Sequence, residues 1–507
     1  VLAVLCRDMP FCTASVRGEL NQRGLRIHTI VSCNLVTRRD ATGELQAVLD
    51  AGQAADTDDV SRESLLFFEI GHQSREEVRR ELAESVAAII GSVAQVVDDF
   101  EPMRERLAAV LASVEQCAVV SADYRDEAAA FLVWLRHNHM TFLGYEYIEV
   151  SRDGGVLRVE VDPALSLGRL RGQNTRGPED LLADLESMSL EELLRRQLSF
   201  SKSRQRSRVH RLAYPDYVEI KEFGADGEVI GQHRFIGLYT SSVYTMDPMQ
   251  IPILRRKVAR IVDMSGLHES EHEGRELARV LELFPRDELF QSSIRELCAT
   301  VTAVNQIQER RQTRLFVRRD AHGKFVNCLV YVPRESYTTA LRIRVQDLLT
   351  EAFHAQESEF NTFFSESVLV RCHFVLKVDP ANPVDFDVNE IEEQSVQATQ
   401  AWEDRLRDRL IEEFGEEKGE EYVAELAPGF PAGYRDDFDP RVAVLDIKKI
   451  QKLLDGKELA MTLYRMLEER DDMLRLRLYH PDHSLPLSDV LPILENLGLR
   501  VVSERPY

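Results

Sequence analysis

The stretch that decides the fold is Phe131–Val150, FLVWLRHNHMTFLGYEYIEV. Its first half predicts a helix, since apolar residues recur there at one-turn spacing. The polar triplet His137 to His139 interrupts that pattern with poor helix formers. Thr141 to Val150 is rich in aromatic and β-branched residues and predicts a strand, with a bend or bulge at Gly144. A helix that runs directly into an aromatic strand indicates the core of a compact α+β unit.

Downstream of this stretch, the turn Asp153-Gly154-Gly155 leads into further elements. The patterns predict strands at 156–161, 199–211, 217–223 and 229–238, and a short helix at 179–196. Antiparallel strands around short helices are typical of a small sensory-type α/β sheet.

Upstream, the chain opens with a predicted β-α-β-β-α order. Strands are expected at 1–6, 26–36 and 65–70, with helices from Asp8-Met9-Pro10 to Arg23 and at 74–97. Pro10 suits a first helical turn and Gly24 suits the residue after a helix end. This order lacks one strand of the ferredoxin-like β-α-β-β-α-β unit.

Two later regions repeat this opening. Near the C-terminus, a strand at 474–479 precedes a helix that Gly498 ends, and a strand at 499–503 follows. In the middle, the turn 318–323 resembles the turn 38–43, and a strand at 325–332, a helix at 337–353 and a strand at 367–378 follow it. Because internal repeats define modular architectures, we expect three βαβ-type modules joined by helical segments.

Composition narrows the functional classes. A chain of 507 residues is too long to fold around a single hydrophobic core. The net charge of −23 argues against general nucleic-acid binding and against binding to an anionic membrane surface. The seven cysteines are scattered without a CxxC pair, which predicts reduced thiols in the cytoplasm. No apolar run is long enough to span a bilayer. Val1 lies in a strand-like run and Tyr507 follows one, so we expect a segment of a longer protein.

Catalytic motifs are few. No GxGxxG, GxxxxGK[ST] or GxSxG occurs, so no dinucleotide fingerprint, P-loop or nucleophile elbow is predicted. His268-Glu269-Ser270-Glu271-His272 fits HExxH, but a polar stretch between Gly266 and Gly274 favours an exposed loop over a zinc site. His137 and His139 could ligate a cofactor, although a structural role at a helix end is the simpler interpretation.

Basic residues alternate along one predicted strand, at Lys202, Arg204, Arg206, Arg208 and His210. Alternation places them on one face. That face is interpreted as solvated, with an anion site or the docking of an acidic subunit surface as the alternative. The hydroxyl-rich Leu238–Tyr244 is interpreted as a strand end and turn rather than a phosphate site.

Several long stretches together resemble one family. They are 131–145, Tyr214–Tyr244 (YPDYVEIKEFGADGEVIGQHRFIGLYTSSVY), 251–258 (IPILRRKV) and Phe284–Phe290 (FPRDELF), with Met9-Pro10-Phe11 and 24–28 near the start. They are similar to the N-terminal half of the large bacterial NAD-dependent glutamate dehydrogenases, over essentially the whole chain.

The resemblance implies an α+β multidomain protein of ACT-like modules, one PAS-like domain and helical connectors. The expected division is an ACT-like module at 1–98, a linker helix at 99–120, a PAS-like domain at 121–245, a connector at 246–312, a second ACT-like module at 313–380, a connector at 381–460, and the start of a third module at 461–507. Catalytic and NAD-binding residues would lie outside this segment.

The intact enzyme would then convert L-glutamate to 2-oxoglutarate and ammonia with NAD as a cytoplasmic homo-oligomer, and this segment would regulate and assemble it while binding neither NAD nor a metal. An amino-acid effector is expected at Asp8, Met9, Pro10 and Phe11, where a strand meets a helix N-terminus whose free N–H groups suit a carboxylate. The alternative is a non-enzymatic ACT/PAS sensor or scaffold that acts on a separate partner.

Overall fold

A computed structural model describes the chain apart from residues 51–59, 154–155, 173–177, 268–269, 308–309, 400–401, 455, 457, 466–473 and 482–484. The described residues divide into two compact units. The first contains residues 1–310, 318–327 and 375–383, and the second contains 311–317, 328–374 and 384–507.

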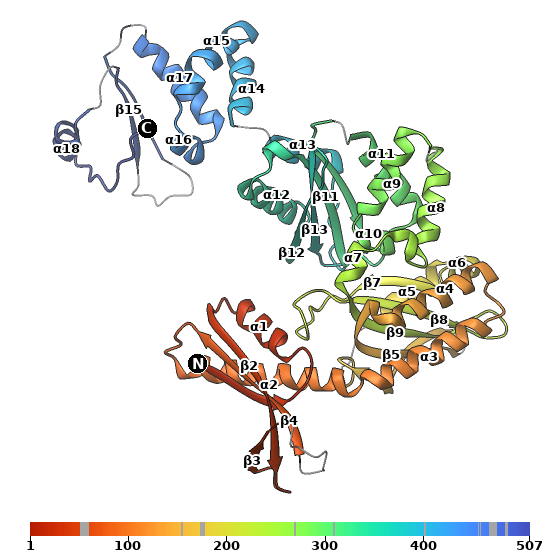
Figure 1. Cartoon of the computed structure of the whole chain (residues 1–507). Helices are drawn as coiled ribbons and strands as arrows, with labels where there is room; N and C mark the ends of the chain where they lie inside the picture. The colour runs from red at the N-terminus through yellow and green to blue at the C-terminus, as the bar shows by residue number, and fades with distance from the viewer. Residues whose placement is uncertain are drawn as a thin grey trace. The chain divides into compact units, whose positions relative to one another are not determined.

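The first module is an α/β sandwich built on a four-stranded sheet. Its elements are β1 (Leu2–Arg7), α1 (Cys12–Gln22), β2 (Ile27–Arg39), β3 (Leu45–Leu49), β4 (Val60–Ile70) and α2 (Glu76–Asp98). The sheet order is β1-β4-β2-β3, and α1 and α2 cover one of its faces (Figure 1). The predicted order is confirmed, with β3 as an addition that the sequence analysis missed.

The helix-to-strand transition of the opening stretch is confirmed. After α3 (Phe100–Gln116), α4 (Ala122–Trp134) continues into the π-helical turn η1 (Leu135–His139), and β5 (Met140–Asp153) begins at once. Asn138 adopts a φ of 62°, which ends the helix. The register of β5 against β9 (Val229–Tyr239) shifts between Phe142 and Gly144, at the predicted bulge.

The middle domain contains a five-stranded antiparallel sheet in the order β6-β5-β9-β8-β7. Its other elements are β6 (Val156–Gly168), α5 (Pro178–Ser187), α6 (Leu190–Arg195), β7 (Leu198–Lys202) and β8 (Asp216–Phe223). The strand predicted over 199–211 is wrong beyond Lys202. There the chain leaves β8 and forms a loop closed by a single bridge between Ser207 and Ala213.

The second module repeats the first. Its elements are β10 (Arg314–Arg319), β11 (Phe325–Pro333), η3 (Arg334–Ser336), α12 (Thr339–Ala352), β12 (Glu357–Phe364), β13 (Leu369–Lys377) and α13 (Val388–Thr399). The sheet order β10-β11-β13-β12 reproduces β1-β4-β2 in its last three strands, with β10 added beside β11. The sequence analysis missed β10 and β12.

The third module shows β14 (Ala460–Tyr464) paired antiparallel with β15 (Arg475–Tyr479), followed by α18 (Leu487–Asn496). The strand predicted at 499–503 is wrong, because those residues are irregular. In the first module the strand after the helix pairs with β4 and not with β1, so 499–503 would need a partner other than β15.

The helix ends support the repeat directly. After α1, Leu25 N–H donates to Leu20 O at 3.0 Å; after α12, Ala355 N–H donates to Thr350 O at 2.9 Å; after α18, Leu499 N–H donates to Leu494 O at 3.0 Å. Each follows a residue with positive φ, namely Gly24, His354 and Gly498. All three first helices therefore end in the same Schellman motif.

Two groups of short helices connect these parts. The first group follows the middle domain and comprises α7 (Ser241–Thr245), η2 (Pro248–Gln250), α8 (Leu254–Ser265), α9 (His272–Leu283), α10 (Arg286–Gln291) and α11 (Ile294–Ile307). The second follows α13 and comprises α14 (Trp402–Phe414), α15 (Glu416–Leu426), η4 (Ala427–Gly429), α16 (Ala432–Asp437) and α17 (Pro440–Leu454).

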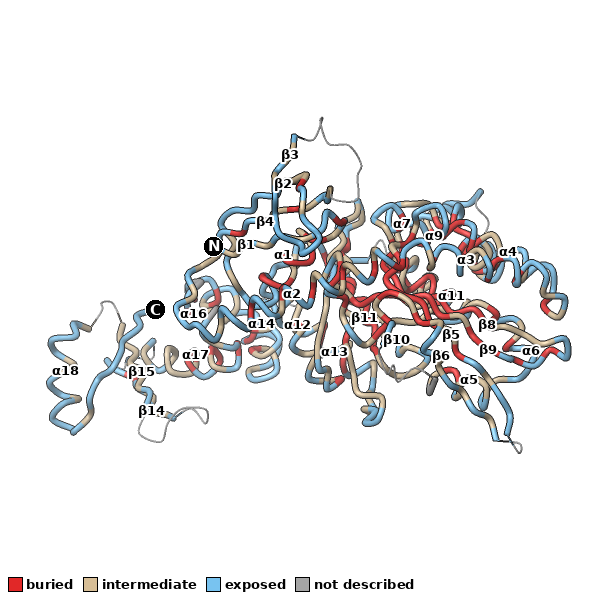
Figure 2. The backbone as a smooth tube through the Cα atoms, turned by 90° about the horizontal axis from the view of Figure 1, so that it is seen from below, coloured by how far each residue is buried: buried red, intermediate tan, exposed pale blue. Residues whose placement is uncertain are grey.

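The first module and the middle domain share one hydrophobic core. Val16 and Leu20 of α1 and Val93 of α2 belong to the same buried cluster as Leu143 and Ile236 of the middle sheet. Strands β5, β8 and β9 are largely buried, whereas β1 to β3 are mostly exposed or half-buried (Figure 2). Because packed cores transmit displacement, α1 is mechanically joined to the middle domain.

Candidate effector site

The predicted effector loop lies between β1 and α1. The Asp8 carboxylate accepts hydrogen bonds from Ser64 Oγ at 2.7 Å and from Asn34 Nδ2 at 3.2 Å, and Asp8 N–H donates to Arg62 O. These bonds anchor the loop to β2 and β4.

The four predicted residues separate on the surface. The Met9 side chain is buried in the shared core, while Asp8 and Pro10 are exposed and Phe11 is half-buried. Pro10 does not lie in the first helical turn as predicted, because α1 begins at Cys12 and Phe11 is its N-cap residue. A ligand at this loop would therefore meet Asp8, Pro10 and Phe11 but not Met9.

The N-terminus of α1 has no side-chain cap. Phe11 adopts a φ of 72° and provides no side-chain cap, so the helix relies on other partners for its first N–H groups. Burial raises the pKa of the adjacent Cys12 thiol to about 12, which keeps it neutral. The loop carries no activated nucleophile.

Phe11 also contacts the middle domain. Its ring lies 4.7 Å from the His210 ring, centroid to centroid. His210 has a positive φ of 71°, and its N–H donates to Ser15 Oγ at 2.9 Å. Two non-glycine residues in the left-handed region thus contact each other, a conformation that costs about 1–3 kcal/mol for each residue. Burial, and then the charge of Arg211, lowers the pKa of His210.

Glu19, one turn further along α1 from Ser15, connects three elements. Its carboxylate accepts hydrogen bonds from Arg23 Nε at 2.7 Å, Ser85 Oγ at 2.6 Å and an Arg208 terminal nitrogen at 2.7 Å. Burial would raise the pKa of Glu19, but these donors outweigh it and lower the pKa to about 2. Glu19 is therefore an ionised tie between α1, α2 and the loop that follows β7.

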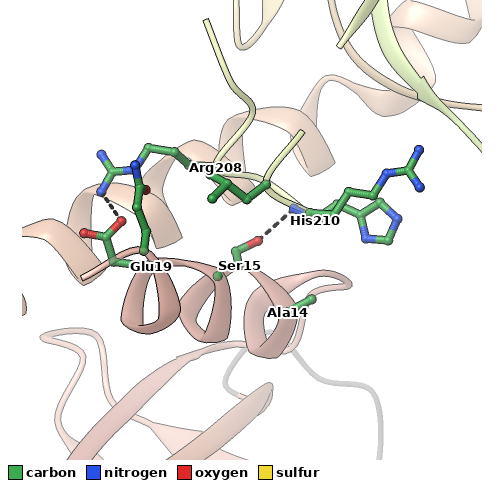
Figure 3. Close-up of a pocket in the computed structure, with 9 residues that line it drawn as sticks. Ala14, Ser15, Glu19, Arg208 and His210 are labelled. Carbon is green, nitrogen blue, oxygen red and sulfur yellow. Dashed lines mark hydrogen bonds and ion pairs between the residues drawn. The ribbon is translucent and has the colours of Figure 1, made fainter. Parts of the chain in front are cut away.

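A small pocket, open to solvent, lies beside this tie. It is lined by α1 and by the loop after β7, through Ala14, Ser15, Gly18, Glu19, Gln22, Arg208, His210, Arg211 and Leu212. Figure 3 shows Glu19 and Arg208 facing each other at one end, with Ser15 and the His210 backbone joined at the other. The pocket adjoins the predicted loop through the Phe11–His210 contact.

The alternating basic residues do not form one solvated face. Lys202 Nζ lies 2.9 Å from Asp216 and 3.1 Å from Asp287, and its side chain is only 10% exposed. Burial lowers the pKa of Lys202, but the two carboxylates outweigh it and raise the pKa overall. Arg208 binds Glu19. Both residues therefore join parts of this chain. The interpretation as a solvated face is wrong for Lys202, whereas the Arg208 side chain is 46% exposed.

The stretch Phe284–Phe290 (FPRDELF) forms a joint, meaning a cluster of contacts that links α10 to β7 and β10. In the sequence it carried only the family resemblance. Arg286 donates to the carbonyl oxygens of Met246, Glu282 and Phe284. The next two residues are acidic: Asp287 pairs with Lys202, and Glu288 with Arg318 of β10. A charged triplet between aromatic residues was the available signal for such a joint.

Lys257 of α8 binds the C-terminal end of α10 in the same joint. Its Nζ donates to Leu289 O, Phe290 O and Ser292 O at 2.9, 2.7 and 2.9 Å. Burial lowers the pKa of Lys257 to about 7. Three carbonyl oxygens around one ammonium group favour its charged form and fix the last turn of α10.

The other candidate residues have structural partners. The His139 ring stacks on Trp134 at 4.2 Å, and His137 Nδ1 lies 2.8 Å from Val133 O. Leu238–Tyr244 forms the end of β9 and the start of α7. His268 and Glu269 lie outside the described residues, and His272 begins α9. Within the described part, no group of three or more potential metal ligands is found.

Five family models match the chain in order. They describe the glutamate dehydrogenase ACT1 domain at residues 1–86, helical motif 1 at 251–310, the ACT2 domain at 314–403, helical motif 2 at 409–453 and the ACT3 domain at 458–507. The chain belongs to the N-terminal region of the large NAD-specific glutamate dehydrogenases.

Relatives match along almost the whole chain. An NAD-specific glutamate dehydrogenase of Pseudomonas aeruginosa is 43% identical over 507 residues, covering 99% of this chain and 31% of the relative. An NAD-specific glutamate dehydrogenase of Halomonas elongata is 41% identical over 509 residues, covering 100% of this chain and 31% of the relative. One of Mycobacterium tuberculosis is 28% identical over 511 residues, covering 97% of this chain and 30% of the relative. The chain thus spans about a third of these relatives, not the half that was predicted.

The ACT modules and the mixed α/β class are therefore confirmed. Among the helices in the described residues, none is long and apolar enough to cross a membrane.

Proposed function

We propose that this chain is the regulatory and assembly region of an NAD-dependent glutamate dehydrogenase. The intact protein would oxidatively deaminate L-glutamate to 2-oxoglutarate and ammonia, with NAD as its cofactor. The observation that carries this proposal is the order of three ACT domains and two helical motifs along one chain, all described by glutamate dehydrogenase family models.

The proposed effector is a free amino acid at the loop of Asp8, Pro10 and Phe11. Its carboxylate would accept hydrogen bonds from the uncapped N-terminus of α1, where the helix dipole favours negative charge. Asp8 is exposed, and its carboxylate, which accepts hydrogen bonds from Ser64 and Asn34, would pair with the ammonium group of the amino acid. Phe11 and Glu19 would carry the change to the middle domain.

The remaining assignments belong to the same proposal. The sheet order β6-β5-β9-β8-β7, which is 2-1-5-4-3 in chain order, supports a PAS-like domain within 121–245. The other domain limits stay as predicted from the sequence. A cytoplasmic homo-oligomer without nucleic-acid or membrane partners fits the acidic composition.

Activity measurements test the enzymatic part. With L-glutamate and NAD, the intact protein should produce NADH and residues 1–507 alone should produce none. An intact protein without this activity would refute the assignment to a dehydrogenase and favour the non-enzymatic sensor. NADH production by residues 1–507 would refute the purely regulatory role.

A further inference from the structure

One loop of the middle domain contacts both the first module and the start of β11 in the second. We call this loop the strap: it comprises residues 203–215, between β7 and β8. Its contacts with both modules lie within the first compact unit, which includes residues 318–327 and 375–383. Most of the alternating basic residues of the sequence belong to it. The proposed function uses only its contacts with Phe11 and Glu19.

The tip of the strap is fixed to α1. The Arg208 side chain donates to the Glu19 carboxylate at 2.7 Å, and the His210 N–H donates to Ser15 Oγ at 2.9 Å (Figure 3). Between these two bonds, Val209 is buried in the hydrophobic cluster that also contains the apolar residues of α1. An ion pair, a hydrogen bond and core packing thus hold three consecutive residues, so a movement of α1 displaces the tip of the strap.

The strap is closed by bonds of its own backbone and side chains. Ser207 is fully buried, and its N–H donates to Ala213 O at 2.8 Å. Its Oγ accepts a hydrogen bond from Val209 N–H at 3.1 Å. Arg169, just after β6, donates to Arg206 O at 2.9 Å. A loop closed in this way moves as a unit instead of absorbing a displacement by bending.

The base of the strap contacts the second module. The Tyr214 ring is buried and packs edge-on against the Phe325 ring at 5.2 Å, centroid to centroid. The Arg206 guanidinium lies over the Tyr214 ring, 5.0 Å from its centroid. Hydrogen bonds within its own turn, and then the charge of Arg204, lower the pKa of Asp379, which follows β13. The strap therefore meets the second module at the start of β11 and just after β13.

We propose that the strap couples the position of α1 in the first module to the start of β11 in the second. This inference deepens the proposed regulation and rests on it for the signal: an effector that shifts α1 would move the strap and, through Tyr214, the Phe325 ring. Phe325 begins β11, every residue of which is buried, so a displacement there enters a packed strand. The alternative is a loop that packs against both modules and transmits nothing.

Hydrogen–deuterium exchange of the intact protein distinguishes the two. Arg208→Ala removes the tie to Glu19, which loosens the strap and its contact with β11. Exchange should then rise in α1 and also in residues 318–327, by about two- to thirtyfold at the distant site. The matched control is Arg39→Ala, which removes an ion pair with Glu63 between β2 and β4 of the same module. It should raise exchange in those strands and leave residues 318–327 unchanged.

The reciprocal variant is Tyr214→Leu, which keeps an apolar side chain and removes the ring contact with Phe325. Because coupling between two sites is reciprocal, exchange should rise in α1 as well. Helix α9, which packs against α8 and α11, is the internal reference and should exchange as in the unmodified protein.

Changes confined to the substituted end of the strap in both variants would overturn the proposal. So would a rise at residues 318–327 in Arg39→Ala, or a rise in α9 in either strap variant, because both indicate a general loosening of the chain. These measurements require neither an effector nor NADH production. Failure of the coupling would therefore leave the assignment to a dehydrogenase standing, and failure of that assignment would leave the coupling standing.

Discussion

The first helices of the first two modules end alike and begin differently. Both α1 and α12 stop in a Schellman motif. At the other end, the Thr338 side chain accepts a hydrogen bond from Leu341 N–H at 3.0 Å and caps α12, whereas Phe11 leaves α1 uncapped. One repeated unit thus caps the first turn of its helix with its own side chain, and the other does not.

The first strands of the two modules also differ, in how far their residues are buried. Every residue of β11 is buried, while β1 alternates between half-buried and exposed residues. The second module therefore contributes a strand to the protein interior, and the first keeps its strand and loop near solvent. Modules of similar topology thus differ in the burial of their first strand and in the capping of their first helix.

The largest effect should come from the charged joint of the second module. Glu288→Ala leaves Arg318 buried without its bidentate carboxylate, and removal of one partner from a buried pair costs about 3–5 kcal/mol. Urea unfolding followed by circular dichroism measures the loss. The matched control is Glu335→Ala, whose exposed pair with Arg311 should contribute about 0–1 kcal/mol.

Leucine-to-alanine substitutions should reveal the difference in packing between β1 and β11. Leu329→Ala in β11 removes a fully packed side chain and should cost about 2–5 kcal/mol, whereas Leu5→Ala in β1 should change stability by about 0.5 kcal/mol or less. Thermal unfolding of residues 1–507 measures both. Equal losses would show that β1 is as deeply packed as β11 and would remove the contrast between the modules.

Low pH should destabilise the first module, because the Glu19 carboxylate becomes protonated. Its pKa is about 2 when folded against an ordinary 4.5, so its contribution is complete above pH 4.5 and is lost as the pH falls toward 2. Stability of residues 1–507 should fall over that range, and Glu19→Gln should make the fall shallower. An unchanged slope in the variant would assign the acid sensitivity to other carboxylates.

The smallest effect should come from the cap of α12. Thr338→Ala removes the hydrogen bond to Leu341 N–H and should cost about 1 kcal/mol. The corresponding change in the first module, Phe11→Ala, removes no cap and should act through the contact with His210 and the packing of Phe11 against the core. Amide exchange in the first turn of each helix distinguishes the two losses.

Periodicity and turn chemistry predicted most helices, the helix-to-strand transition at Asn138 and the repeated helix ends. They missed β3, β10, β12 and β14, which are short or mixed in polarity and depend on neighbouring strands for their hydrogen bonds. The similar turns at 38–43 and 318–323 are both closed by a bond from glycine N–H to Asp40 O or Asp320 O. They nevertheless occupy different places in their modules, so a local turn signal did not identify the equivalent strands.

The candidate site was predicted only in part. A helix N-terminus after an apolar strand indicated the loop of Asp8–Phe11, but the burial of Met9 depends on packing with the middle domain. The ties of Arg208 to Glu19 and of Lys202 to Asp287 join residues far apart in the chain. The alternation of basic residues predicted that their side chains share one face of a strand. It could not predict the acidic residues with which they pair.

Calorimetric titration of the intact protein with the common amino acids tests the central claim most directly. At least one should give saturable heat, and Thr13→Pro, which removes one first-turn N–H of α1, should abolish it. The matched change in α12, Ala340→Pro, should leave it intact. No saturable heat with any amino acid, or equal loss from both variants, would contradict an effector site at the start of α1.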